Sequence, residues 1–252
     1  YMEETVKTPG KSMEYDYFLN DFLPKIKNTP IINFMGGEPT LHPKFTDIFR
    51  NTYDDILPYS HLSVFTNGLM PDKALDLMLE MAGTNGARTK NVVFAILLNW
   101  QTMENISEKN HERCKEVAEK MLRTNGYSVT FSLNLYSKDQ NLEKQCEEID
   151  AIYQKVGLPK DKLYKIRVSP AFPIIGGESN VYLPIRDYPK VGRQMLKILQ
   201  RFPQMCFRFD CSFPPCFLDE IEEDQFSLTD RFFFHGNKQL PPTEEWKNND
   251  YY

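Results

Sequence analysis

The sequence predicts an α/β fold with parallel strands, and two observations support this. Short apolar, β-prone runs recur along the chain, and longer polar segments with helical spacing of apolar residues lie between them. Each run is almost continuously apolar, which is typical of a strand buried on both faces. Strands and helices that alternate in this way favour parallel pairing with right-handed crossovers.

The expected strands fall at residues 31–35, 62–66, 92–99, 129–135 and 163–168. A helix is expected at residues 11–28, before the first strand, and four more follow the first four strands. The apolar faces of these four helices are formed by Phe45, Ile48 and Phe49; by Ala74, Leu75, Met78 and Met81; by Val117, Met121 and Leu122; and by Ile149, Ile152, Tyr153 and Val156. Because a helix comes first, we expect a sixth strand upstream of Tyr1.

The composition changes after Pro173, and this change sets the expected domain boundaries. Residues 1–173 form the main α/β domain, and residues 174–205 form a connecting loop and a helix at 187–202. In that helix Asp187 is the expected N-cap and Pro189 lies in the first turn. Residues 206–252 are rich in Phe, Pro and Cys and end in a polar tail, so we expect a C-terminal extension there.

Composition and charge exclude several classes of protein. The chain has 252 residues, of which 41% are hydrophobic and 26% charged, as in globular proteins with a packed core. A formal net charge of −5 argues against general nucleic-acid binding. Apolar runs stay well short of the roughly 18–20 residues of a membrane span. We therefore expect a cytoplasmic protein that binds neither nucleic acid nor a membrane.

The double glycine at Gly36 and Gly37, followed by Glu38 and Pro39, comes directly after the first expected strand. In parallel α/β folds the chemistry takes place at the carboxyl ends of the strands. Glycines let a ligand approach the backbone closely, and a neighbouring carboxylate can hold an ammonium group. A tight turn with a surface glutamate is the alternative interpretation of these residues.

The longer string F-M-G-G-E-P-T-L-H-P, residues 34–43, resembles the segment of radical S-adenosylmethionine enzymes that binds the amino-acid tail of the cosubstrate. V-F-T-N-G, residues 64–68, resembles the T-N-G of the third strand of that superfamily. Asn99, Ser132 and Asn134 fit polar positions that line its site. The resemblance covers roughly residues 1 to 218 and implies a partial (β/α)6 TIM-type barrel with parallel strands, plus a Cys-containing extension.

The resemblance also implies roles for individual residues. Gly36 and Gly37 offer backbone groups to the methionine end of S-adenosylmethionine, and Glu38 accepts a hydrogen bond from its amino group. The neighbouring cofactor-binding positions are Pro39, which fixes the exit of the loop, with Thr66, Asn67 and Asn99. Ser132, Asn134 and Arg167 are candidates for its carboxylate or ribose, or else their polar groups are simply satisfied in the barrel interior.

The defining C-x3-C-x2-C of that superfamily, which holds a [4Fe–4S] cluster, is absent from these residues. We expect the three cysteines upstream of Tyr1, because an aromatic residue follows the third cysteine in many members. A degenerate barrel that lost its cluster and only binds is the rival interpretation.

A second cysteine pair, Cys211 and Cys216, is separated by a stretch containing two prolines. It resembles the start of a SPASM or twitch-like extension, which implies an auxiliary iron–sulfur cluster. No cysteine follows Cys216, so a structural role stays open. The other cysteines, Cys114 and Cys146 above all, are expected to be structural thiols, since an odd total of five argues against a disulfide framework.

The resemblance therefore implies an enzyme that cleaves S-adenosylmethionine to a 5′-deoxyadenosyl radical, with a peptide or protein side chain as substrate and a reductant such as flavodoxin or ferredoxin. A radical enzyme for a small molecule and a binding protein without a cluster are the alternatives. An aldolase-type barrel needs a strand-end lysine or an acidic metal cluster, and Lys90 and Lys165 fall at strand starts or middles.

Overall fold

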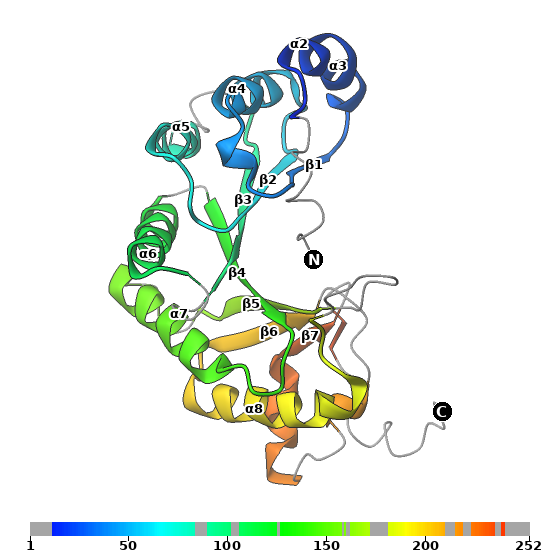
Figure 1. Ribbon diagram of the computed structural model, residues 1–252, viewed down its shortest axis with the longest axis vertical. Coiled ribbons are helices and arrows are strands. Elements are labelled where there is room, and N and C mark those ends of the chain that lie inside the picture. Colours follow the sequence, from blue (N-terminus) through cyan, green and yellow to red (C-terminus); the bar gives the residue numbers. More distant parts are fainter. Residues whose placement is uncertain are drawn as a thin grey trace. The chain divides into compact units, whose positions relative to one another are not determined.

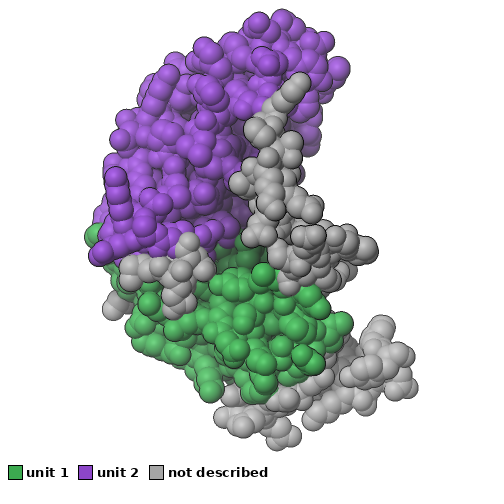
Figure 2. Space-filling view, in the orientation of Figure 1, with its two compact units in different colours: residues 1, 131–252 green, residues 2–130 purple. Residues whose placement is uncertain are grey.

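A computed structural model describes residues 12–83, 90–101, 106–124, 127–157, 159, 162–171, 181–209, 215–218, 223–234 and 238–239 (Figure 1). The chain divides into two compact units (Figure 2). One unit is formed by residues 2–130, and the other by residue 1 with residues 131–252. Both combine parallel strands with helices, so the predicted α/β class is confirmed.

The unit of residues 2–130 contains three parallel strands, β1 (Ile31–Phe34), β2 (His61–Thr66) and β3 (Val93–Asn99). Alternate residues of β2 and β3, such as Leu62 and Phe94, are buried. The strands are joined or followed by the helices α4 (Phe45–Asp55), α5 (Asp72–Gly83) and α6 (Glu108–Arg123). These helices bury the apolar faces that the sequence predicted, including Phe49, Met78 and Val117.

The first helix of this unit is interrupted, although the sequence predicts one continuous helix at 11–28. It begins as α2 (Tyr15–Tyr17), continues as a π-helical turn η1 (Phe18–Phe22) and ends as α3 (Leu23–Ile26). Phe18 and Leu23 are buried in a small cluster with Ile48 of α4. A helical segment before β1 is thus confirmed, but the π turn was not predicted.

The unit of residues 131–252 continues the pattern. Strand β4 (Tyr127–Leu135) begins before the division, and β5 (Tyr164–Pro170), β6 (Met205–Phe209) and β7 (Phe232–Phe234) follow β4 in parallel, with β8 (Lys238–Gln239) antiparallel to β7. Helix α7 (Leu142–Val156) ends at Gly157, whose φ of 80° suits glycine. Helix α8 (Tyr188–Arg201) follows the short η4 (Ile185–Asp187). Asp187 is the N-cap of α8, and a proline lies in the first turn of α8.

The five predicted strands are confirmed with small shifts at their ends, but β6 and β7 were not predicted as strands. The predicted boundary between residues 205 and 206 falls inside β6, so the first residues of the expected extension continue the parallel sheet. The segment after β6 also packs on α8. A Cβ atom on Gly192 would lie 1.8 Å from the carbonyl oxygen of Phe217, in η5 (Pro215–Leu218), so only glycine fits there.

Aromatic rings fill the core beside this contact. The rings of Phe209, Phe217 and Phe232 lie 5.4–5.5 Å apart between centroids, in tilted or edge-on pairs. Arg231, at the end of η6 (Glu223–Arg231), donates hydrogen bonds to carbonyl oxygens at and beyond the end of α8. A separate Cys-containing extension is therefore not confirmed for the described part.

Within the described residues, no helix is long and apolar enough to cross a membrane.

Candidate functional site

The loop after β1 exposes main chain at the carboxyl end of a parallel strand. Gly36 and Gly37 are both exposed, and Met35 before them is 64% exposed. Gly36 has a φ of 156°, which residues with a side chain rarely adopt, although a Cβ atom there would meet nothing within 4 Å. The glycine requirement at this position is therefore one of backbone conformation, and it leaves room for a ligand beside the chain.

Glu38 fixes this loop through hydrogen bonds with four donors. One carboxylate oxygen accepts from the backbone N–H and the hydroxyl of Thr40, at 3.2 and 2.6 Å. The other accepts from the Thr66 hydroxyl and the Asn67 backbone N–H, both at 2.8 Å. Glu38 is thus the N-cap of η2 (Pro39–Leu41) and also joins the ends of β1 and β2.

These contacts bring Gly36, Gly37, Glu38, Thr66 and Asn67 together, as the sequence predicted for one site. The carboxylate, however, has partners that differ from the one we expected. A carboxylate offers about four acceptor positions, and protein donors take all four here. An amino group of a ligand would therefore find the carbonyl oxygens of the glycines more readily than the Glu38 side chain.

The T-N-G loop after β2 is folded on itself and packed against α6. The Asn67 side chain accepts from the Leu69 backbone N–H at 2.9 Å, and the Thr66 hydroxyl accepts from that of Gly68 at 3.0 Å. Gly68 has a φ of 82°, and a Cβ atom there would lie 3.0 Å from the Cys114 sulfur. Both conformation and space therefore require glycine.

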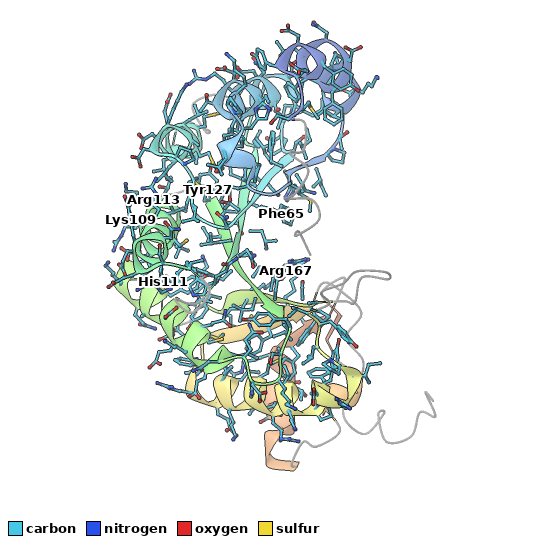
Figure 3. The ribbon with its side chains drawn as sticks, viewed as in Figure 1. Phe65, Lys109, His111, Arg113, Tyr127 and Arg167 are labelled. Carbon is cyan, nitrogen blue, oxygen red and sulfur yellow. The ribbon has the colours of Figure 1, made fainter. Side chains whose placement is uncertain are left out.

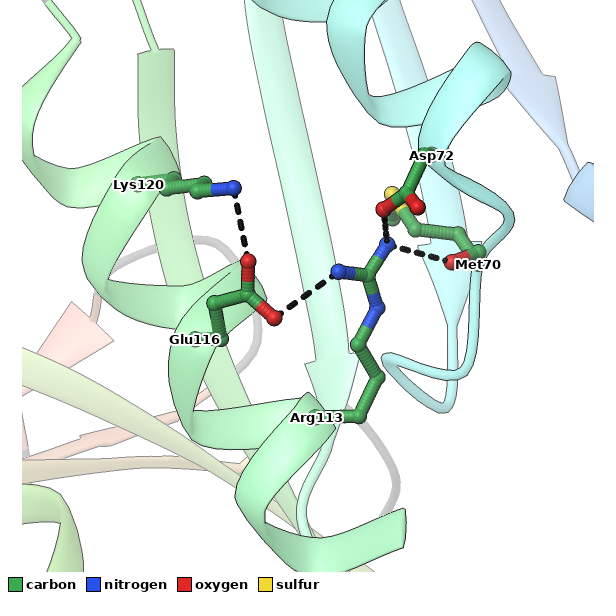
Figure 4. A network of polar contacts seen from close by, with 5 residues as sticks. All are labelled: Met70, Asp72, Arg113, Glu116 and Lys120. Atoms are coloured by element: carbon green, nitrogen blue, oxygen red, sulfur yellow. Dashed lines mark hydrogen bonds and ion pairs between the residues drawn. The ribbon is translucent and has the colours of Figure 1, made fainter. Parts of the chain in front are cut away.

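Two neighbouring residues of α6 hold this loop, and sequence reasoning did not identify either as part of the site. The Cys114 thiol donates to the carbonyl oxygen of Asn67 at 3.1 Å. Arg113 donates to the carbonyl oxygen of Met70 at 2.9 Å and to the carboxylate of Asp72 at 2.6 Å (Figure 4). No local signal marks these two residues, because their partners are more than 40 positions away in the chain.

The Arg113 side chain also forms an ion pair with a residue of its own helix. Its guanidinium donates to Glu116 at 2.9 Å, and Glu116 also pairs with Lys120 at 2.6 Å (Figure 4). The Arg113 side chain is only 21% exposed, so this pairing is less screened than an ordinary surface ion pair. The chain of contacts from Glu38 to α6 therefore makes one stiff scaffold under the two loops.

An apolar cavity of about 550 Å³ opens beside the double glycine. Its wall combines the interrupted first helix, β1 and the start of α4, with residues that include Phe18, Phe22, Phe34, Phe45, Leu41 and His42. His42 accepts from the Lys44 backbone N–H at 3.1 Å, and its other ring nitrogen lies 3.0 Å from the carbonyl oxygen of Met13. His42 therefore links the loop to the segment just before the first helix.

The remaining predicted site residues lie in both units. Asn99 is the last residue of β3, in the unit of residues 2–130. Ser132, Asn134 and Arg167 lie in the other unit, where Ser132 of β4 and Arg167 of β5 are register partners. Arg167 donates to the Ser132 hydroxyl at 3.0 Å, so these two groups have a partner within the protein.

The cysteines described by the structure are buried thiols. Burial raises the pKa of Cys114 and of Cys206 to about 11, and it also raises the pKa of Cys146. Cys211 lies outside the described residues, and only the backbone of Cys216 is described, in η5. Among the described residues, no group of three or more His, Cys, Asp and Glu side chains could hold a metal ion.

The lysines of the aldolase alternative are held by contacts unrelated to catalysis. The Lys90 ammonium donates to the carbonyl oxygens of Tyr53, Asp54 and Ile56 at the end of α4. Such a lysine caps a helix C-terminus. Lys165 lies over the ring of Phe233, with its nitrogen 5.5 Å from the ring centre.

Comparison of the chain with protein-family models, curated proteins and solved structures finds no match.

Proposed function

We propose that the chain acts as a radical S-adenosylmethionine enzyme, which cleaves its cosubstrate to a 5′-deoxyadenosyl radical and removes a hydrogen atom from a peptide or protein side chain. The observation that carries the proposal is the exposed double glycine at the end of β1, joined by Glu38 to the T-N-G loop at the end of β2. Ligands of parallel α/β folds bind at these strand ends.

The residues around the double glycine fit the methionine end of S-adenosylmethionine. The carbonyl oxygens of Gly36 and Gly37 are the acceptors for its ammonium group, since Glu38 is saturated by protein donors. Glu38 is then a positioning residue that keeps the glycines in place. Asn99, Ser132, Asn134 and Arg167 remain the candidates that the resemblance names for the carboxylate and ribose of the cosubstrate.

A [4Fe–4S] cluster would supply the electron for the cleavage. No described residue is assigned to this cluster. Cys211 and Cys216 remain the proposed ligands of an auxiliary cluster. We further propose that the strands belong to a partial (β/α)6 barrel and that the protein is cytoplasmic. A reductant such as flavodoxin or ferredoxin is its proposed electron donor.

The test is anaerobic incubation of the intact gene product, reconstituted with iron and sulfide, with S-adenosylmethionine and dithionite. We expect 5′-deoxyadenosine as a product. Gly36→Ala should lower its rate about tenfold or more, because alanine disfavours the observed φ. Gly83→Ala, at the exposed end of α5 where a Cβ atom meets nothing within 4 Å, is the matched control and should leave the rate unchanged.

Two outcomes would count against the proposal. Fewer than about three irons per chain after reconstitution argue against a four-iron cluster. Binding of S-adenosylmethionine without any 5′-deoxyadenosine would instead favour the alternative of a binding protein. A small-molecule substrate is favoured if the radical forms but peptides encoded beside the gene remain unmodified.

A further inference from the structure

Three cationic side chains share one face of the strands in the unit of residues 131–252. Lys165 and Arg167 are two residues apart on β5, so their side chains point to the same face. Arg208 of β6 is in register with Arg167. Residues in register on neighbouring strands point the same way, about 4.8 Å apart. The two guanidinium groups therefore start from adjacent positions.

Contacts confirm that these side chains lie on one face. Arg167, labelled in Figure 3, donates to Ser132, its register partner on β4. Lys165 lies over the ring of Phe233, and Phe233 is the register partner of Arg208 on β7. A single row, Ser132, Arg167, Arg208 and Phe233, thus crosses four parallel strands.

The charge that the described strands contribute to this face is positive. The sequences of β4, β5, β6 and β7 contain these three cations and no aspartate or glutamate. Arg167 and Arg208 are half-buried, so water screens their mutual repulsion less than at an open surface. An anion bound between them lowers this repulsion and gains charge-assisted hydrogen bonds.

A buried hydroxyl on the same face points to a ligand independently of the charge. Ser169 lies two residues after Arg167 and is only 9% exposed. Its hydroxyl oxygen has no hydrogen-bond partner among the described residues. Buried hydroxyl groups normally have a partner, so this one is a donor in place for an incoming acceptor.

We propose that this row binds a carboxylate of the peptide substrate, either an acidic side chain or the C-terminal carboxylate. The inference rests on the proposed function for the identity of the ligand as a peptide. The planar guanidinium fork matches a carboxylate through two parallel hydrogen bonds, which favours this group. The five N–H donors of Arg167 can serve the cosubstrate and this carboxylate together, and Arg208 supplies the additional cation. A nucleic acid is a poorer candidate, because the chain as a whole carries a net charge of −5.

The experiment is calorimetric titration with a capped hexapeptide that contains two glutamates, and with the same peptide carrying glutamines instead. We expect the glutamate peptide alone to bind, more weakly at about 0.2 M salt than at low salt. Arg208→Gln should weaken its affinity about tenfold, the effect of losing a charged hydrogen bond. Arg208→Lys should restore part of it.

Arg186→Gln is the matched control, since Arg186 is exposed in η4 and lies outside the row. Its affinity should stay within about twofold of the unaltered protein. The proposal is overturned by equal losses in Arg186→Gln and Arg208→Gln, by equal binding of the two peptides, by no binding at all, or by equally tight binding of an oligothymidylate. Circular dichroism of each variant identifies a folding defect, and in that case the partial rescue by Arg208→Lys decides.

The titration needs neither iron nor S-adenosylmethionine, so it separates this inference from the proposed function. Glutamate-peptide binding without formation of 5′-deoxyadenosine would refute the radical enzyme and keep the anion site. Formation of 5′-deoxyadenosine with unchanged peptide affinity in Arg208→Gln would refute the anion site and keep the radical enzyme.

Discussion

Replacement of Glu38 tests the scaffold beneath the double glycine most directly. Glu38→Ala removes an acceptor from four donors, of which two are backbone N–H groups. Glu38→Gln is the finer change. Its amide nitrogen takes the place of one oxygen, and it cannot accept from the backbone N–H that faces that oxygen. The threonine hydroxyls can rotate and accept instead, so only one of the backbone bonds is lost.

The magnitude follows from the number of bonds. A hydrogen bond to a charged group contributes about 1.5–3 kcal/mol, and an unsatisfied buried donor costs a similar amount. Because Glu38 is only half-buried, water replaces part of the loss. We therefore expect about 3 kcal/mol for Glu38→Ala and about 1.5 kcal/mol for Glu38→Gln as the drop in the free energy of local opening. These values correspond to increases of roughly 100-fold and 10-fold in the equilibrium constant for local opening.

Native-state hydrogen exchange measures this opening at single amides. The amides of Thr40 and Asn67 should exchange faster in both variants, in the order Ala, Gln, unaltered protein. Glu14→Gln is the control, because Glu14 is exposed and its side chain makes no cap hydrogen bond. Unchanged exchange at Asn67 in Glu38→Ala would show that the carboxylate is not its acceptor and is free for a ligand, which refutes the reasoning.

Three further predictions concern the loop after β2 and its support. Gly68→Ala should lower the free energy of unfolding by about 2–3 kcal/mol, because a Cβ atom there is crowded. Gly157→Ala has a similar positive φ but open space around it, and it should cost only about 1 kcal/mol. Equal losses in denaturant titrations would exclude crowding as the cause. The Cys114 thiol should resist alkylation at pH 8 in the folded chain, as followed by peptide mass mapping. The folded-state pKa of Cys114 is about 11, above the ordinary 9.0. The contribution of this thiol to the free energy of unfolding is therefore complete below pH 9 and is lost as the pH rises toward 11. A free energy of unfolding that increases over this pH range would contradict the prediction. Arg113→Lys should cost about 1–2 kcal/mol, because the arginine contacts Glu116 through one nitrogen and Met70 and Asp72 through another, and the single nitrogen of a lysine cannot take both positions. Asp76→Asn on the exposed face of α5 should change stability by less than about 0.5 kcal/mol.

The glycines show how far local reasoning reaches. Gly36 and Gly157 need positive φ, and the sequence marks both through a strand end and a helix end. Gly192 could not be recognised, because its constraint is the carbonyl oxygen of Phe217, 25 residues along the chain in a different element. Contacts of this kind depend on how elements pack, and no local pattern encodes them.

The sequence by itself determined the α/β alternation, five of the strands and the place of the double glycine at a strand end, since apolar runs and turn residues act over a few neighbouring positions. Only the tertiary structure decided that Thr66 and Asn67 donate to Glu38, that α6 supports the T-N-G loop, and that Arg167 and Arg208 are in register. Each of these facts requires two strands, or a strand and a helix, to be aligned to within a residue. That alignment is set by the burial of whole faces and the closing of backbone hydrogen bonds across the sheet, which are properties of the folded chain and not of any one segment.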